Sequence, residues 1–352
     1  MSLGLLSPSF LPASTLDTNL TLTSPILTNG QVQLSVLGEP GVTCVIQSSP
    51  DLSSWTPILT NSDFSPTRVV TVDAPNDSSY YRAVIPSFPH FGYAVAAVTT
   101  VNLNGNGFIT DSFNSSDTNL STGGYYNASK ISTNGDMATV KGMVNIGTHT
   151  IDGNLFLGPA ASYISSTNQV LGSIYTNRTL SFPNVVMPPA LASSPTVPIV
   201  GHSPNFTNWI TVNGYYTINN AYPIVVGTNV TTWVRMTTAN FNSSITLQGE
   251  ITNSATAYLY FDPASATSAT IVNSPSARAR NLVIYGLPNL TQLTVNQSTF
   301  TGVIYAPTAI VTLSGGGGAN HIMGSVIGRS ITMNAHYEFH FDEDLLNLLN
   351  FP

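Results

Sequence analysis

The densest group of side chains that could do chemistry lies near the C-terminus, in the stretch HYEFHFDED. His336, Glu338, His340 and Asp342 occupy every second position there. In a β-strand, residues at this spacing point to the same side of the sheet. Imidazole nitrogens and carboxylate oxygens are ligands for transition-metal ions. The stretch is therefore a candidate metal centre, and His321 could add a ligand from the preceding strand.

The same pattern is typical of the outer face of a terminal strand. Tyr337, Phe339 and Phe341 alternate with the four polar residues and are expected to pack inward, which leaves the polar residues facing outward. Neighbouring side chains on one face of a flat strand diverge, so one strand alone positions metal ligands poorly. We therefore expect neither a metal nor another cofactor, and these four residues are weak candidates only.

Four aspartates elsewhere are the next candidates for chemistry, namely Asp111, Asp117, Asp136 and Asp152. A polysaccharide lyase or glycosidase built on a β-helix would need paired carboxylates, or calcium-binding acids, in one groove. Each of these aspartates lies beside Gly or Ser, which is typical of turns. The sequence contains no G-x-S-x-G, H-E-x-x-H or P-loop signature. We expect no enzyme and no catalytic residues.

The composition limits the partners of the chain. Only 7% of the 352 residues are charged, against about 25% in an ordinary soluble domain, and the formal net charge is −7. The few basic residues form no stripe that could bind nucleic acid and no cluster that could bind anionic lipid. Pro8 and Pro12 interrupt the N-terminus, so we expect no signal peptide and no membrane span in this chain. Cys44 is alone and is expected to be a buried small hydrophobe.

The N-terminal quarter of the chain predicts an arm and a small β-sandwich. Residues 1–25 end in alternating apolar positions, Leu16, Leu20 and Leu22, which is the pattern of a strand that could be donated to another subunit. Residues 26–86 contain short alternating strands separated by turns such as GEPG and APND. We expect an Ig-like sandwich there.

The rest of the chain predicts a β-solenoid over residues 92–342. Strands of five to seven residues, rich in Val, Ile, Leu and Thr, are joined by Asn-Gly, Gly-Asn or Asp-Gly corners. The stretch MPPALASSPTVP opens a segment, about residues 187–239, that we expect to be a loop-rich insertion. Residues 343–352 form a capping or docking tail. Its apolar side chains stand at helical spacing: Leu345, Leu346, Leu348, Leu349 and Phe351.

Two parts of the sequence resemble known groups. The stretch GEPGVTCVIQSSPDLSSWTPILTNS, followed by YYRAVIP, resembles a small β-sandwich module common in secreted bacterial surface proteins, with Cys44 in place of its usual aromatic residue. Residues 95–345, above all FTGVIYAPTAIVTLSGGG and HIMGSVIGRSITMNAHYEFHFDEDL, resemble the β-helical domain of PilX-like and bactofilin-like bacterial surface proteins. The resemblance implies a right-handed β-helix at the cell surface or in a filament, and it implies no activity.

These features favour a structural role outside the cell. A surface rich in hydroxyls and amides but poor in charge can meet copies of itself with little repulsion. Apolar segments at both ends of the chain suit a head-to-tail homopolymer. We therefore expect an all-β structural subunit of a bacterial surface filament or matrix. The alternative is a monomeric adhesin or carbohydrate-binding protein that binds surface glycans.

Overall fold

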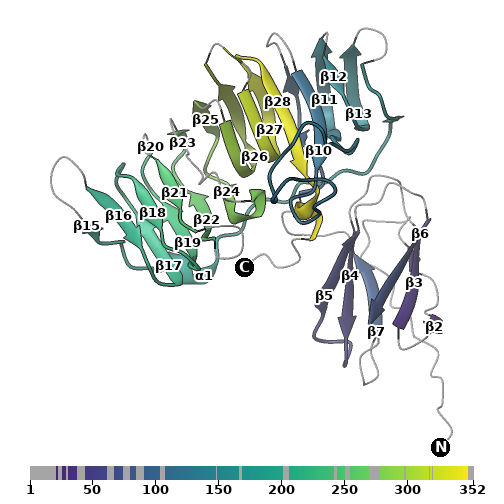
Figure 1. Cartoon of the computed structure of the whole chain (residues 1–352), viewed down its shortest axis with the longest axis horizontal. Helices are drawn as coiled ribbons and strands as arrows, with labels where there is room; N and C mark the ends of the chain where they lie inside the picture. The colour runs from purple at the N-terminus through teal and green to yellow at the C-terminus, as the bar shows by residue number, and fades with distance from the viewer. Residues whose placement is uncertain are drawn as a thin grey trace, which may run out of the picture. The chain divides into compact units, whose positions relative to one another are not determined.

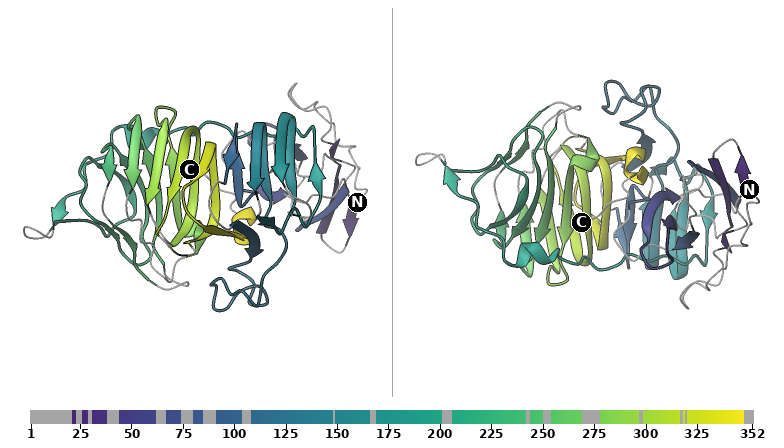
Figure 2. Two further views of the ribbon diagram at one scale, coloured as in Figure 1. Left: turned by 90° about the horizontal axis from the view of Figure 1, so that it is seen from above. Right: turned by 90° about the horizontal axis from the view of Figure 1, so that it is seen from below.

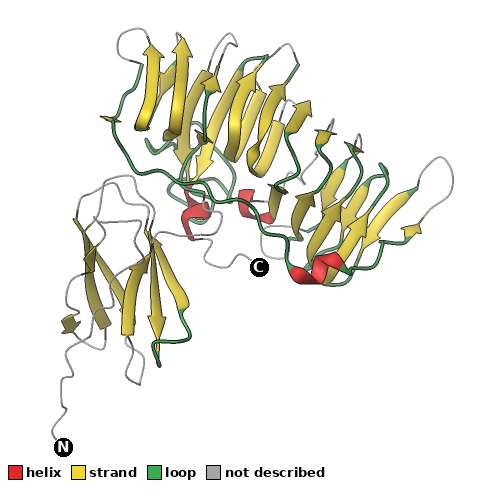
Figure 3. Ribbon diagram, turned by 180° about the vertical axis from the view of Figure 1, so that it is seen from behind, coloured by secondary structure: helices red, strands yellow, loops and turns green. Residues whose placement is uncertain are grey.

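The protein is an all-β chain that forms a small β-sandwich and a β-solenoid, as the sequence predicts (Figures 1 and 3). The two are separate compact units, one centred on residues 1–90 and the other on residues 91–345. The computed structural model describes residues 21–22, 26–28, 31–37, 44–61, 67–73, 80–84, 91–103, 108–147, 149–165, 169–200, 206–241, 244–249, 254–268, 278–296, 299–316, 318 and 320–347.

The sandwich has two antiparallel sheets. One contains β1 (Thr21–Leu22), β2 (Ile26–Thr28), β3 (Gln31–Leu37) and β6 (Thr67–Asp73), and the other β4 (Cys44–Ser49), β5 (Thr56–Asn61) and β7 (Tyr80–Val84).

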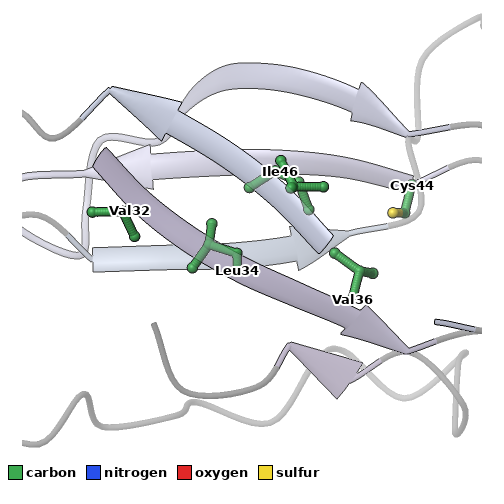
Figure 4. Packing of buried hydrophobic residues seen from close by; sticks show 6 residues of the cluster. Val32, Leu34, Val36, Cys44 and Ile46 are labelled. Atoms are coloured by element: carbon green, nitrogen blue, oxygen red, sulfur yellow. The ribbon is translucent and has the colours of Figure 1, made fainter. Parts of the chain in front are cut away.

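Alternation along β3 explains the core of the sandwich. Every second residue, Val32, Leu34 and Val36, is buried, while the residues between them face outward or are half-buried. Cys44 and Ile46 of β4 belong to the same cluster (Figure 4). Cys44 is 1% exposed within this cluster, so it packs as a small hydrophobe, as predicted.

The solenoid is a stack of short parallel strands (Figure 2). Its first part contains β8 (Val95–Ala97), β9 (Val101–Asn102), β10 (Phe108–Phe113), β11 (Met137–Gly147), β12 (Thr150–Ile151), β13 (Leu155–Ser165), β14 (Ile174–Tyr175) and the short helix α1 (Pro189–Ala192). The middle contains β15 (Ile199–Val200), β16 (Thr207–Ile210), β17 (Gly214–Ile218), β18 (Ile224–Val226), β19 (Thr231–Met236), β20 (Asn240–Phe241), β21 (Ile245–Leu247), β22 (Thr256–Phe261) and β23 (Ser265–Ser268). The last part contains the 3-10 turn η1 (Ala279–Asn281), β24 (Leu282–Gly286), β25 (Gln292–Asn296), β26 (Thr299–Ser314), β27 (Asn320–Met333), β28 (Tyr337–Asp342) and the 3-10 helix η2 (Glu343–Asn347).

Stacked apolar side chains form the solenoid core. In parallel strands, residues in register lie above one another, so inward positions build continuous ladders. One ladder runs through eight strands, and each of its side chains is fully buried. Its members in spatial order are Val234, Leu259, Ile284, Ile304, Val326, Val95, Met137 and Leu155.

The spatial order of the strands departs from the order in sequence. The first strand of the solenoid, β8, pairs with β27 on one side and with β11 on the other. Likewise, β10 lies between β28 and β12, and its register with β28 runs from Phe108↔Tyr337 to Phe113↔Asp342. The chain therefore enters the stack in the middle and winds to the end that contains β14. It then crosses to the opposite end, at β15, and winds back until its last coil lies beside its first.

The predicted loop-rich insertion at about residues 187–239 is wrong for most of its length. Among the described residues of this part of the chain, the longest stretch without a strand is the crossing segment, residues 176–198, which contains α1. From β16 to β19 the chain forms regular parallel strands of the stack. The Pro-rich start of the segment marks the crossing correctly, but the strand-forming sequences WITV, GYYTI and TTWVRM follow it.

The crossing segment covers one outer face of the stack. The Tyr305 hydroxyl donates a hydrogen bond to the Pro183 carbonyl oxygen over 2.9 Å, and the Phe182 and Tyr93 rings meet edge to face. At the far end, the Val197 amide donates to the Thr217 carbonyl oxygen over 3.0 Å. This cover explains why aromatic side chains on the outer face of β22, β24 and β26 are buried.

Candidate functional site

Three potential metal ligands lie together on the last two strands of the solenoid. His321 belongs to β27, and Glu338 and His340 belong to β28. Nδ1 of His321 lies 3.1 Å from Nε2 of His340 and 3.4 Å from Oε2 of Glu338. Nε2 of His340 lies 3.8 Å from the same carboxylate oxygen. Each residue therefore presents one donor atom to a common point.

A buried carboxylate fixes the orientation of the His340 ring. Nδ1 of His340 lies 2.6 Å from Oδ1 of Asp111 on β10, and both side chains are almost completely buried. An ionised carboxylate accepts hydrogen bonds only, so Nδ1 is the nitrogen that donates to Asp111. The other ring nitrogen, Nε2, therefore faces His321 and Glu338.

Tyr126 completes the support of this ring. Its hydroxyl donates to Oδ2 of Asp111 over 2.9 Å, and its ring stacks on His340 with centroids 3.7 Å apart. Burial raises the pKa of Tyr126, and the negative charge of Asp111 raises it further, so the phenol stays protonated as a donor. Tyr126 lies in the β10–β11 loop, residues 114–135, which folds over the end of β28.

The outward side of HYEFHFDED is not solvent-exposed along its whole length, because His340 and Asp342 are covered. Both are buried, whereas Glu338 and His336 are half-buried, because the β10–β11 loop covers that end of the strand. Oδ1 of Asp342 accepts hydrogen bonds from the backbone amides of Ser115 and Asp344. Burial raises the pKa of Asp342 to about 6. Asp342 therefore anchors the loop and lies outside the ligand group.

His336 lies beside the group without joining it. Its Nε2 is 3.4 Å from Oε1 of Glu338, the carboxylate oxygen that faces away from His321 and His340. His336 therefore contacts the Glu338 carboxylate but is not one of the three potential metal ligands.

The aspartates assigned to turns fall into different environments. Asp117 does cap a turn, since its side chain accepts the Asn119 amide hydrogen bond over 2.8 Å. The turn prediction is wrong for Asp111, which is a buried strand residue. Asp136 is also buried, and Oδ1 accepts hydrogen bonds from the backbone and the side chain of Asn154. Burial raises the pKa of Asp136 to about 7. Asp152 is half-buried, and its pKa is raised by burial and by Asp111.

The predicted assembly residues are only partly within the described residues. Leu22 forms β1, pairs with Val36 and packs against the sandwich core. Leu345 is 2% exposed and Leu346 is half-buried, both on η2. The remaining positions lie outside the described residues: Leu16, Leu20, Leu348, Leu349 and Phe351.

Exposed apolar side chains gather at both ends of the solenoid stack. At the β13–β14 end, Ile174 continues an inward ladder above Leu155 yet is 39% exposed, because no described strand covers it. Ile164 on β13 and Leu171 next to β14 are 54% and 61% exposed. At the opposite end the exposed apolar side chains are those of Ile199, Val200, Trp209, Val212 and Tyr222.

Comparisons with known proteins give one family match and one similar solved structure. Residues 209–348 match a family described as a domain of unknown function, DUF7305, over less than half of the chain. No curated protein matches the chain. A crystal structure of a glycosylated ice-binding protein (LeIBP) from an Arctic yeast is similar at 12% identity and a TM-score of 0.32, over 71% of this chain and 90% of that one. None of the helices formed by the described residues is long and apolar enough to cross a membrane.

Proposed function

We propose that the protein is a non-catalytic structural subunit of an extracellular bacterial surface filament or matrix, and that its solenoids join end to end. The observation that carries the proposal is the exposure of inward-facing apolar side chains at both ends of the stack. Ile174 ends one inner ladder, and Ile199 pairs with the inward residue Asn208 at the other end. A solenoid needs a polar cap or a neighbour at each end to keep such a core from water.

The two ends differ, which favours a polymer over a dimer. One end presents the edge of parallel strands β13 and β14, and the other presents the antiparallel pair β15–β16. Contact between unlike ends is a heterologous interface, and such interfaces form filaments when the rotation between subunits does not close a ring. Because Leu345 is buried within its own chain, the solenoid ends replace the C-terminal tail as the proposed contact.

The side of the stack also suits a dense assembly. One outer ladder consists of Thr294, Thr312, Thr332, Asn102 and Asn145, all half-buried and all uncharged. Such a surface lacks the like charges that would keep neighbouring filaments apart. Filaments with this surface could pack side by side, so the proposal includes a matrix of filaments as well as a single filament.

Glycan binding remains the second candidate, and outward aromatic rings are the observation behind it. Tyr215, Trp233 and Tyr258 form a stacked ladder, with ring centroids 4.9 Å and 5.7 Å apart. However, stacked rings present their faces to each other, so the ladder offers sugars fewer free faces than three separate rings would. Trp209, which is 41% exposed, is the better-placed single platform.

A charge placed at one end of the stack is expected to block self-association. For Ile174→Lys, we expect the concentration at which half of the chains associate to rise at least tenfold, because burying an unpaired ammonium group in an apolar contact is costly. Sedimentation velocity over a concentration series measures this. Val186→Lys is the matched control, because Val186 is 80% exposed but lies on the crossing segment. Equal association by both variants would refute contact through this end, and glycan binding by a stable monomer would favour the second candidate.

A further inference from the structure

We propose that His321, Glu338 and His340 bind one divalent transition-metal ion, with Zn²⁺ as the best match. The proposal rests on the geometry of these side chains and is independent of the filament. Ligand atoms about 2.0–2.1 Å from one tetrahedral Zn²⁺ lie roughly 3.3–3.4 Å from one another. The three donor atoms here are separated by 3.1, 3.4 and 3.8 Å, so one ion fits among them with small side-chain adjustments.

The chemistry of the donors selects the class of ion. Two imidazole nitrogens and one carboxylate oxygen suit Zn²⁺, Ni²⁺ or Cu²⁺, whereas Mg²⁺ and Ca²⁺ prefer sites made of oxygen ligands. Three protein ligands leave one tetrahedral position for a water molecule. The half-exposed side chains of His321 and Glu338 give an ion access from solvent.

The surroundings of His340 prepare it as a ligand. A metal-binding histidine usually donates its other ring N–H to a carboxylate, which fixes the tautomer and makes the ligand nitrogen more basic. Asp111 is that carboxylate here, at 2.6 Å from Nδ1. Tyr126 in turn holds Asp111 by a hydrogen bond and holds the imidazole ring by stacking. The buried Asp111–His340 pair therefore presents an oriented ligand nitrogen to the more exposed side chains of His321 and Glu338.

The position of the site indicates a structural role. His321 belongs to β27 and His340 to β28, which are neighbouring strands on successive coils at the end of the chain. Asp111 belongs to β10, the strand of the first coil that pairs with β28. An ion at this point would connect β27 to β28 directly, and through Asp111 to β10 and the β10–β11 loop. It would stabilise the contact between the first coil and the last coil of the solenoid, where β10 pairs with β28.

Titration with ZnCl₂ tests the proposal on the full chain after treatment with a chelator. We expect isothermal titration calorimetry to show one ion per chain, with no comparable binding of Mg²⁺. We expect the Tm to rise by about 5 °C at a hundredfold excess over the Kd. His321→Ala and Glu338→Gln each remove one ligand without touching Asp111, and each is expected to weaken binding at least a hundredfold.

His149→Gln is the matched control. His149 lies in the turn before β12, outside the ligand group, so this variant is expected to bind Zn²⁺ as the wild type does. Circular dichroism of all three variants without metal separates loss of a ligand from loss of folding. Absence of saturable one-to-one binding, or equal affinity in folded His321→Ala, would overturn the proposal.

Discussion

Replacing Gly324 with alanine is expected to destabilise the solenoid by roughly 3 to 5 kcal/mol. Gly324 on β27 has φ +137°, a conformation that side chains with a Cβ rarely adopt. Its register partner on β26, Gly302, has φ +155°. A Cβ on Gly324 would meet the Gly302 carbonyl oxygen at 1.9 Å, so the backbone of two adjacent coils would have to separate.

Gly316→Ala is the matched control for this prediction. A Cβ at Gly316 meets nothing within 4 Å, so we expect a change within about 0.5 kcal/mol. Denaturant unfolding in a Trp55→Phe background measures the solenoid, because Trp209 and Trp233 then provide the fluorescence. Equal stability of the Gly324 and Gly316 variants would show that the two coils are not in the register described here.

The free energy of unfolding is expected to fall as the pH rises from about 4 to about 7. Burial raises the pKa of Asp136 to about 7 and that of Asp342 to about 6, whereas both carboxyls have their ordinary pKa of 3.8 in the unfolded chain. Between these values the folded chain binds more protons than the unfolded chain, so raising the pH favours unfolding. The effect is on the order of 3 kcal/mol for each group.

The Asp136→Asn variant removes the larger of the two contributions to the pH dependence of the free energy of unfolding, that of Asp136. Oδ1 of Asp136 accepts hydrogen bonds from Asn154, a role that an asparagine oxygen can keep, while the buried Oδ2 has no partner among the described residues. We expect the variant to lose about half of the pH dependence and to be at least as stable as the wild type at pH 8. Asp117→Asn, in a turn, is expected to retain the full dependence. Wild-type stability that increases from pH 5 to pH 8 in chemical denaturation would contradict this account.

The sequence predicts the class of fold because the relevant signals are local. Strand alternation identifies the inward residues of β3 and of β19, and Gly-rich or Asn-rich corners identify the coils. The burial of Cys44 follows in the same way.

The order of the coils and the environment of His340 depend on contacts between distant parts of the chain. The pairing of β10 with β28 joins residues 229 positions apart, such as Asp111 and His340, and no local pattern specifies it. Alternation alone places His340 on an outer face. The β10–β11 loop then buries it, so the roles of Asp111 and Tyr126 could not be predicted from the sequence.

Negative-stain electron microscopy of the purified full chain at rising concentration tests the central claim most directly. The account predicts filaments that lengthen with concentration. Ile174→Lys should prevent them from forming, whereas Val186→Lys should not. Single particles of one size at every concentration, for the wild type as well as for both variants, would contradict a structural protein that assembles through the ends of its solenoid.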